Sequence, residues 1–132
     1  MAKTAILIGS TGLTGSHLMR ILLNSDIYDK TICFVRRETK ISHPKLVQHI
    51  VDFDDVESYK DYMEGNDMFC CLGTTIKKAG SQEAFKKVDL TYPLQFAKVA
   101  AVNGIKQFSI ISAIGANPES SNFYLDRKST RL

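Results

Sequence analysis

Three glycines spaced three residues apart constrain the fold of this chain more than any other feature. A short apolar run, Thr4 to Ile8, leads directly into Gly9, Gly12 and Gly15, and a helical pattern follows. Glycine permits the positive φ angles expected at Gly9 and Gly12, and at position 15 it lets the helix pack close to its strand. The pattern predicts a strand, a tight turn and a helix start that bind the pyrophosphate of a dinucleotide. Tight turns without a ligand use glycine too, so a purely structural turn is the alternative.

The expected dinucleotide site comprises the whole turn. Its residues are Gly9, Ser10, Thr11, Gly12, Leu13, Thr14 and Gly15. Their glycine spacing is G-x-x-G-x-x-G, and no Lys follows Gly15. The missing Lys argues against the phosphate loop of nucleoside triphosphatases, in which Gly-Lys-Ser/Thr closes the motif.

Strands and helices alternate along the rest of the chain. Apolar runs predict five strands, over residues 4–8, 31–35, 46–51, 67–72 and 107–111. Helical spacing covers 13–25, then 54–64 with Asp54 or Asp55 as its cap, and a long region from Ser81 to Gly104 in which Pro93 marks a start or a kink. Right-handed crossovers between these strands predict an α/β fold, a Rossmann-type doubly wound parallel sheet in the order 3-2-1-4-5. Ligands are expected at the carboxyl ends of strands one and four.

Length and composition predict one domain over residues 1–132. With 44% hydrophobic and 23% charged residues and a net charge of +3 from scattered Lys and Arg, the chain has no basic run suited to nucleic acid or a membrane surface. No apolar segment approaches the roughly 20 residues of a membrane span. Cys33, Cys70 and Cys71 lie in predicted strands and are expected to stay unbridged, which predicts a cytoplasmic protein. The histidines lack metal-ligand spacing, so no metal site is predicted.

Strands two and three are predicted to end in residues suited to the adenosine half of a cofactor. Arg36 and Arg37 end strand two, where proteins selective for NAD usually carry an acidic side chain. Two guanidinium groups suit a 2′-phosphate, so NADP is the expected cofactor and NAD the alternative. Asp52 and Phe53 end strand three and could contact the adenine base. The alternatives are solvated arginines, a helix cap and a core aromatic residue.

The predicted end of strand four adds a glycine at the switch point of the sheet. Leu72, Gly73 and Thr74 follow the strand, and backbone passing close to a cofactor explains a glycine there. A plain turn glycine is the alternative.

A candidate catalytic set follows strand five. Ser112 ends that strand, and Tyr124 and Lys128 lie four residues apart, on one face of an expected helix. A neighbouring ammonium group lowers the pKa of a tyrosine and can hold the ribose, while a serine hydroxyl orients a substrate carbonyl. The three residues fit hydride transfer.

Several segments together are typical of one family. They are 9–15, Arg36-Arg37, 71–75, 85–89, 103–108 and 111–116, with 121–124. With them the chain resembles the short-chain dehydrogenase/reductase superfamily in its atypical, extended-like branch, most closely the oxidoreductases related to the Tat-interacting protein, often labelled nucleoside-diphosphate-sugar epimerase-like. The resemblance runs from Lys3 to Lys128 and implies an NADP-binding Rossmann fold in which Ser112, Tyr124 and Lys128 fall on the catalytic serine, tyrosine and lysine.

One departure from that family concerns the end of the chain. Family members continue beyond the lysine into a substrate-binding segment, whereas this sequence closes at Leu132. We therefore expect a Rossmann domain without that segment, whose fifth strand is an open edge suited to self-association. The resemblance implies NADP-dependent hydride transfer to or from a carbonyl or hydroxyl group of a small molecule. The alternatives are a dinucleotide-binding regulatory or sensor protein without turnover and an inactive fragment of the enzyme.

Overall fold

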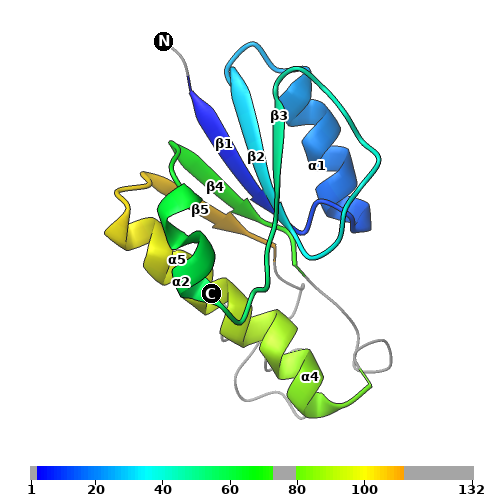
Figure 1. Ribbon diagram of the computed structural model, residues 1–132, viewed down its shortest axis with the longest axis vertical. Helices are drawn as coiled ribbons and strands as arrows, with labels where there is room; N and C mark the ends of the chain where they lie inside the picture. The colour runs from blue at the N-terminus through cyan, green and yellow to red at the C-terminus, as the bar shows by residue number, and fades with distance from the viewer. Residues whose placement is uncertain (1–2, 73–79, 112–132) are drawn as a thin grey trace.

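The predicted strands form one parallel sheet. A computed structural model describes residues 3–72 and 80–111. Its strands are β1 (Thr4–Ile8), β2 (Lys30–Val35), β3 (Leu46–Ile50), β4 (Asp67–Cys70) and β5 (Gln107–Ile110). They lie in the order β3-β2-β1-β4-β5, and each neighbouring pair is parallel, as Figure 1 shows. The Rossmann-type fold and its strand order are therefore confirmed.

Alternate residues of the strands build two hydrophobic cores, one on each face of the sheet. Because neighbouring residues of a strand face opposite sides, Ile6 and Ile8 pack in one core and Ala5 and Leu7 in the other. All four side chains are fully buried, so β1 is covered on both faces. A parallel sheet with both faces covered needs continuous apolar strands, which is what the sequence carries at 5–8.

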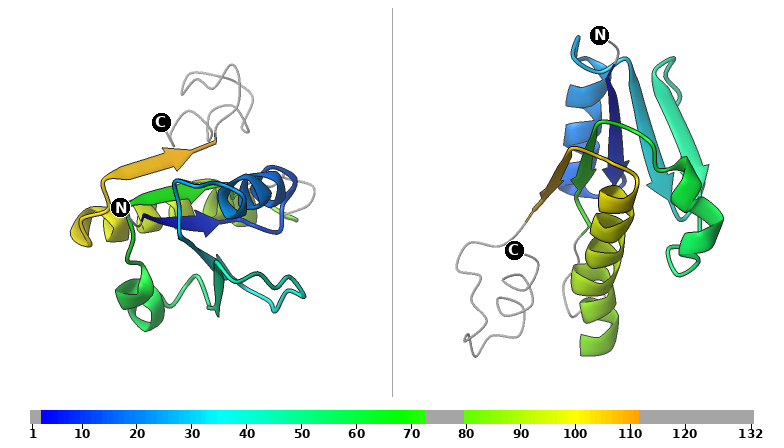
Figure 2. Two further views of the ribbon diagram at one scale, coloured as in Figure 1. Left: turned by 90° about the horizontal axis from the view of Figure 1, so that it is seen from above. Right: turned by 90° about the vertical axis from the view of Figure 1, so that its left-hand side faces the viewer.

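Helices cover the two faces in layers. On one face lies α1 (Leu13–Leu23), whose Met19, Leu22 and Leu23 join the core of Ala5 and Leu7. The other face is covered by α2 (Val56–Tyr59), the 3-10 turn η1 (Lys60–Tyr62) and a continuous helical rod made of α4 (Gln82–Lys86), η2 (Lys87–Thr91) and α5 (Tyr92–Val102). Figure 2 shows α1 and α5 on opposite sides of the strands.

The helical rod widens just before its proline. Pro93 has no N–H group, and its ring crowds the carbonyl four residues earlier, so it does not fit inside a regular α-helix. It lies in the first turn of α5, and the preceding η2 is a π-helical turn. In such a turn the N–H groups bond five residues back, which widens the helix. Pro93 therefore marks the start of α5, one of the two predicted alternatives.

The glycine turn differs from prediction at one position. Gly9 has the predicted positive φ, at +85°. The prediction was wrong for Gly12, which has extended backbone with φ −77° and ψ 174° because it is the N-cap residue of α1. Gly15 packs most closely, since a Cβ added there would lie 1.8 Å from the Gly9 carbonyl oxygen. The same Cβ at Gly12 would lie 3.6 Å from that oxygen, an ordinary contact.

The predicted cap of the helix after β3 is also different. Asp55 occupies the N-cap position of α2, but its side chain makes no capping hydrogen bond. The Asp54 carboxylate instead forms an ion pair with Lys87, at 2.8 Å. Tertiary contact with the helical rod has replaced the local cap.

Cys33, Cys70 and Cys71 are buried and form no disulfide, so the expectation that they stay unbridged is confirmed. Among residues 3–72 and 80–111, β5 has a neighbour on one side only, and self-association through its other edge stays a prediction. In the same residues, no helix is long and apolar enough to span a membrane.

The close approach at Gly15 makes a stability prediction. A Gly15→Ala variant must move α1 away from Gly9, because the added methyl meets backbone and not a flexible side chain. We expect the free energy of unfolding, measured by urea denaturation, to fall by about 1–3 kcal/mol. Gly12→Ser is the control, because Ser is a favoured N-cap residue and its Cβ meets no close neighbour. Equal stability of Gly15→Ala and wild type would contradict the close packing.

Candidate cofactor-binding site

A cavity of about 270 Å³ opens at the carboxyl ends of the strands. Its walls come from the ends of β1, β2 and β4 and from the segment after β3, which meet because the strands are parallel. Its lining residues are Gly9, Ser10, Thr11, Phe34, Val35, Arg36, Arg37, Glu38, Thr39, Phe53 and Leu72. In open α/β sheets this edge, at the point where the strand order reverses, is where ligands bind.

The first helix points its positive end toward this edge. Gly12 caps α1 without a side-chain hydrogen bond, and the first turn of the helix contains no acidic residue. No side chain of the helix thus neutralises the partial positive charge of its first turn. The start of α1 is therefore suited to a phosphate group, as the glycine spacing predicts.

The seven residues of the predicted turn do not all line the cavity. Gly9, Ser10 and Thr11 do. Leu13 and Thr14 instead line a separate groove of about 510 Å³ between α1 and the strands β4 and β5. Gly12 and Gly15 line neither groove and serve the turn itself, as N-cap and as close contact.

The Ser10 hydroxyl has a partner inside the protein. Ser10 is buried and hydrogen-bonds with the Cys33 thiol in the middle of β2. Burial raises the pKa of the Cys33 thiol to about 11, while the Ser10 hydrogen bond acts in the opposite direction.

Two of the predicted strand-end residues are in contact with each other. Arg36 is exposed, Phe53 is buried, and the guanidinium carbon lies 5.6 Å from the centroid of the Phe53 ring. A cation at this distance over a ring face is attracted by the electrons of the ring. Arg37 is exposed in the same lining. The cavity therefore has two guanidinium groups at one end, one of them seated on an aromatic wall.

The remaining predicted residues divide between the cavity wall and other positions. Leu72 lines the cavity. Asp52 does not, because its side chain accepts a hydrogen bond of 2.9 Å from the Asp54 backbone N–H and shapes the turn before α2. The other predicted residues lie outside the described part of the chain: Gly73, Thr74, Ser112, Tyr124 and Lys128.

Sequence reasoning missed two polar residues of the lining, Glu38 and Thr39. They directly follow the predicted arginines, and that adjacency is the signal that could have found them. Thr39 is hydrogen-bonded to the Gln48 side chain of β3, which ties the loop after β2 to the sheet. Glu38 gives the cavity a carboxylate beside its guanidinium groups.

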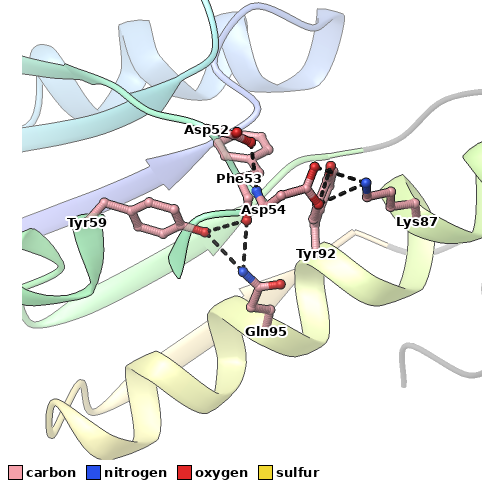
Figure 3. Close-up of polar contacts among 7 residues, drawn as sticks. All are labelled: Asp52, Phe53, Asp54, Tyr59, Lys87, Tyr92 and Gln95. Atoms are coloured by element: carbon pink, nitrogen blue, oxygen red, sulfur yellow. Dashed lines mark hydrogen bonds and ion pairs between the residues drawn. The ribbon is translucent and has the colours of Figure 1, made fainter. Parts of the chain in front are cut away.

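The Phe53 ring forms one wall of the cavity, and we call it the Phe53 wall. Polar side chains that do not line the cavity hold this residue in place, as Figure 3 shows. The Phe53 carbonyl oxygen accepts hydrogen bonds from the Tyr59 hydroxyl at 2.9 Å and from the Gln95 amide at 2.8 Å. Burial raises the pKa of Tyr59 to about 12, against a smaller lowering by its hydrogen bond from Gln95. Its hydroxyl therefore stays protonated and donates over the physiological pH range.

Asp54, the residue after Phe53, is held by the same helical rod. The Lys87 ammonium and the Tyr92 hydroxyl both bond the Asp54 carboxylate, at 2.8 Å and 3.2 Å. The hydrogen bond from Lys87 is the main reason why the pKa of Asp54 is lowered. Phe53 and Asp54 are thus tied to η2 and α5 by three side chains.

Comparison with known proteins gives the family. A family model described as NAD(P)H-binding matches residues 9–131. The chain belongs to this NAD(P)H-binding family. It is 35% identical to the protein HTATIP2 of Rattus norvegicus over 130 residues, covering 96% of the chain and 53% of that protein. It is 37% identical to the mitochondrial protein FMP52 of Meyerozyma guilliermondii, covering 94% of the chain and 54% of that protein. The chain thus spans about half the length of these relatives.

Solved structures share the fold at low sequence identity. The UDP-glucose 4-epimerase of Thermotoga maritima gives a TM-score of 0.78 at 14% identity, covering 97% of the chain and 48% of the enzyme. The Bordetella bronchiseptica enzyme WbmG, solved in complex with NAD, gives a TM-score of 0.79 at 11% identity. The match covers 99% of the chain and 48% of that enzyme. With the family match, these neighbours confirm the NAD(P)H-binding Rossmann fold that the resemblance to short-chain dehydrogenases/reductases implies. A nicotinamide dinucleotide is thus the class of cofactor.

The relatives also correct one expectation. Unbridged cysteines and the lack of a long apolar segment predicted a cytoplasmic protein. Curated FMP52 relatives from three yeasts are named mitochondrial, which contradicts that expectation. Unbridged cysteines indicate a reducing environment only, and this does not single out the cytoplasm.

A larger side chain in the glycine turn should weaken NAD(P)H binding without unfolding the chain. Gly12→Val keeps the backbone of the turn free of close contacts, because the added Cβ lies 3.6 Å from its nearest neighbour. The larger side chain covers the start of α1, so we expect NAD(P)H binding by calorimetry to weaken at least tenfold while the circular dichroism spectrum stays that of wild type. Ala101→Val, at an exposed helical position outside the cavity lining, should retain binding. Unchanged affinity in Gly12→Val would make the turn purely structural.

Proposed function

We propose that this chain is the cofactor-binding part of an oxidoreductase that uses NADP(H) in preference to NAD(H). The observation that carries the proposal is the pair Arg36 and Arg37 in the lining of the same cavity as Gly9 and Thr11. Arginine binds phosphate through paired, charge-assisted hydrogen bonds, which a ribose hydroxyl does not offer in the same strength. The pyrophosphate would lie against the glycine turn and the 2′-phosphate against the arginines.

The orientation of the cofactor follows from this placement. The adenosine half lies toward β2 and β3, where Phe53 offers an apolar wall. The pyrophosphate then crosses Gly9, and the nicotinamide half extends toward the ends of β4 and β5. Ser112, Tyr124 and Lys128 follow β5 in the sequence, so they are the residues that we assign to the ring that exchanges hydride.

We further propose that these three residues carry the reaction, with a carbonyl or hydroxyl compound as substrate. Tyr124 is assigned the transfer of a proton to the substrate oxygen, Lys128 the lowering of the tyrosine pKa and Ser112 the orientation of the carbonyl group. Support comes from the family match, which extends through residue 131 and includes all three positions.

Titration tests the cofactor preference. The wild-type chain should bind NADPH more tightly than NADH, and the double variant Arg36→Ala, Arg37→Ala should lose most of that preference. The loss should be about tenfold or more, since hydrogen bonds to charged groups contribute about 1.5–3 kcal/mol each. Arg20→Ala, Lys98→Ala removes two exposed cations outside the cavity lining and controls for net charge. Equal binding of both cofactors by wild type would refute the NADP assignment.

Catalysis is tested separately from binding. Tyr124→Phe should abolish NADPH-dependent reduction of aldehydes or ketones and leave NADPH affinity within about twofold, because only the acidic hydroxyl is removed. Tyr62→Phe, at an exposed tyrosine outside the cavity lining, serves as the matched control. Undiminished turnover in Tyr124→Phe would remove the tyrosine from the mechanism, and cofactor binding without turnover in wild type would favour a sensor or an inactive fragment of the enzyme.

A further inference from the structure

Phe53 lies in a part of the chain that no strand or helix fixes. It follows the end of β3 at Ile50 and precedes the start of α2 at Val56. Two local hydrogen bonds shape this segment, from the backbone N–H groups of Asp54 and Asp55 to Asp52. Bonds within a turn give it a shape but do not hold it against the rest of the molecule. The position of the Phe53 ring therefore depends on longer-range contacts.

Those contacts come from α5 and its neighbours. The Phe53 ring makes edge contacts with Tyr92 and Phe96, at centroid distances of 5.4 Å and 5.2 Å. Its carbonyl is held by Gln95, which lies 42 residues further along the chain. The Gln95 amide also donates to the Tyr59 hydroxyl at 3.2 Å, so one side chain ties both groups together. Neither Gln95 nor Tyr59 lines the cavity.

The ion pair beside this contact is the weaker support. Lys87 and Tyr92 are five residues apart, which in a regular α-helix would separate them by about 140° around the axis. The wide turn of η2 lets both reach the Asp54 carboxylate. However, the side chains of Lys87 and Asp54 are 48% and 53% exposed, and ion pairs at such exposure stabilise little. The Gln95 amide on a partly buried carbonyl is the more consequential contact.

We propose that Gln95 is a positioning residue for cofactor selectivity, which holds the Phe53 wall beneath Arg36 and so sets the preference for NADP(H) over NAD(H). This inference rests on the proposed function of the cavity. A guanidinium group seated on a fixed ring has fewer orientations to lose when it binds phosphate. Without the amide, Tyr59 is the one remaining side-chain donor to the Phe53 carbonyl among the described residues, so the ring is held less firmly beneath Arg36.

Gln95→Met tests this assignment, because it removes the amide and keeps the length of the side chain. We expect the dissociation constant for NADPH, measured by fluorescence titration, to rise roughly three- to tenfold, the range for one lost hydrogen bond. The constant for NADH should rise less than that for NADPH, since both cofactors share the Phe53 wall but NADH has no 2′-phosphate for Arg36. Tyr59→Phe removes the other donor to the same carbonyl and should shift the ratio of the two constants in the same direction.

Asn103 provides a matched control on the same helix. Its amide bonds the backbone carbonyls of Lys60 and Met63 at 2.8 Å and 2.9 Å, which also joins the end of α5 to the connection between β3 and β4. Asn103→Leu keeps the shape of the side chain and removes an amide that lies outside the cavity lining. Both variants should unfold at lower urea concentration than wild type, and only Gln95→Met should change the ratio of NADPH to NADH affinity.

The outcomes separate this inference from the proposed function. A wild-type preference for NADPH that survives unchanged in both Gln95→Met and Tyr59→Phe overturns the role of Gln95 alone. An equal loss of preference in Asn103→Leu also overturns it, because general loosening would then explain the effect. A wild-type protein without any preference overturns the NADP assignment, and the role of Gln95 with it.

Discussion

The turn at Gly9 has no room for a side chain, and much of the structure depends on this contact. A Cβ at Gly9 would lie 2.7 Å from the backbone carbon of Cys71 and 2.8 Å from the nitrogen of Leu72. A Cβ at Gly15 would lie 1.8 Å from the Gly9 carbonyl oxygen. The end of β1, the segment after β4 and the start of α1 therefore meet backbone to backbone at one residue. This contact sets how closely α1 approaches the carboxyl edge of the sheet.

The cavity is a consequence of that convergence. The backbone at Gly9 forms a ridge at the point where the strand order reverses. The cavity walls on either side of this ridge come from β2 and from the end of β4. Ser10, the next residue of the turn, is buried. A ligand at this edge thus meets main-chain groups and the open end of a helix. Those groups favour phosphate and cannot be removed by changing a side chain.

Periodic features could be predicted from the sequence, and tertiary ones could not. Apolar runs and turn residues predicted each strand of the part of the chain that the structure describes, because a buried parallel sheet requires them. The strand-end rule also placed Arg36 and Phe53 in one cavity, since carboxyl ends of parallel strands lie together. Gly12 was misjudged because the same residue type serves a left-handed turn and an extended N-cap. The bond from Gln95 to Phe53 joins residues 42 apart and has no sequence pattern.

Charge alone does not decide which nicotinamide cofactor fits this cavity. Arg36 and Arg37 favour a 2′-phosphate, but Glu38 in the same lining repels it and would accept a hydrogen bond from a 2′-hydroxyl. Glu38 is exposed and can turn its carboxylate into solvent, where opposing charges are screened. Arg36 instead rests on a buried ring, so its guanidinium stays at the cavity when the ligand arrives. The balance between the two cofactors therefore depends on how firmly Phe53 is held, and that support comes from the side of the molecule away from the cavity.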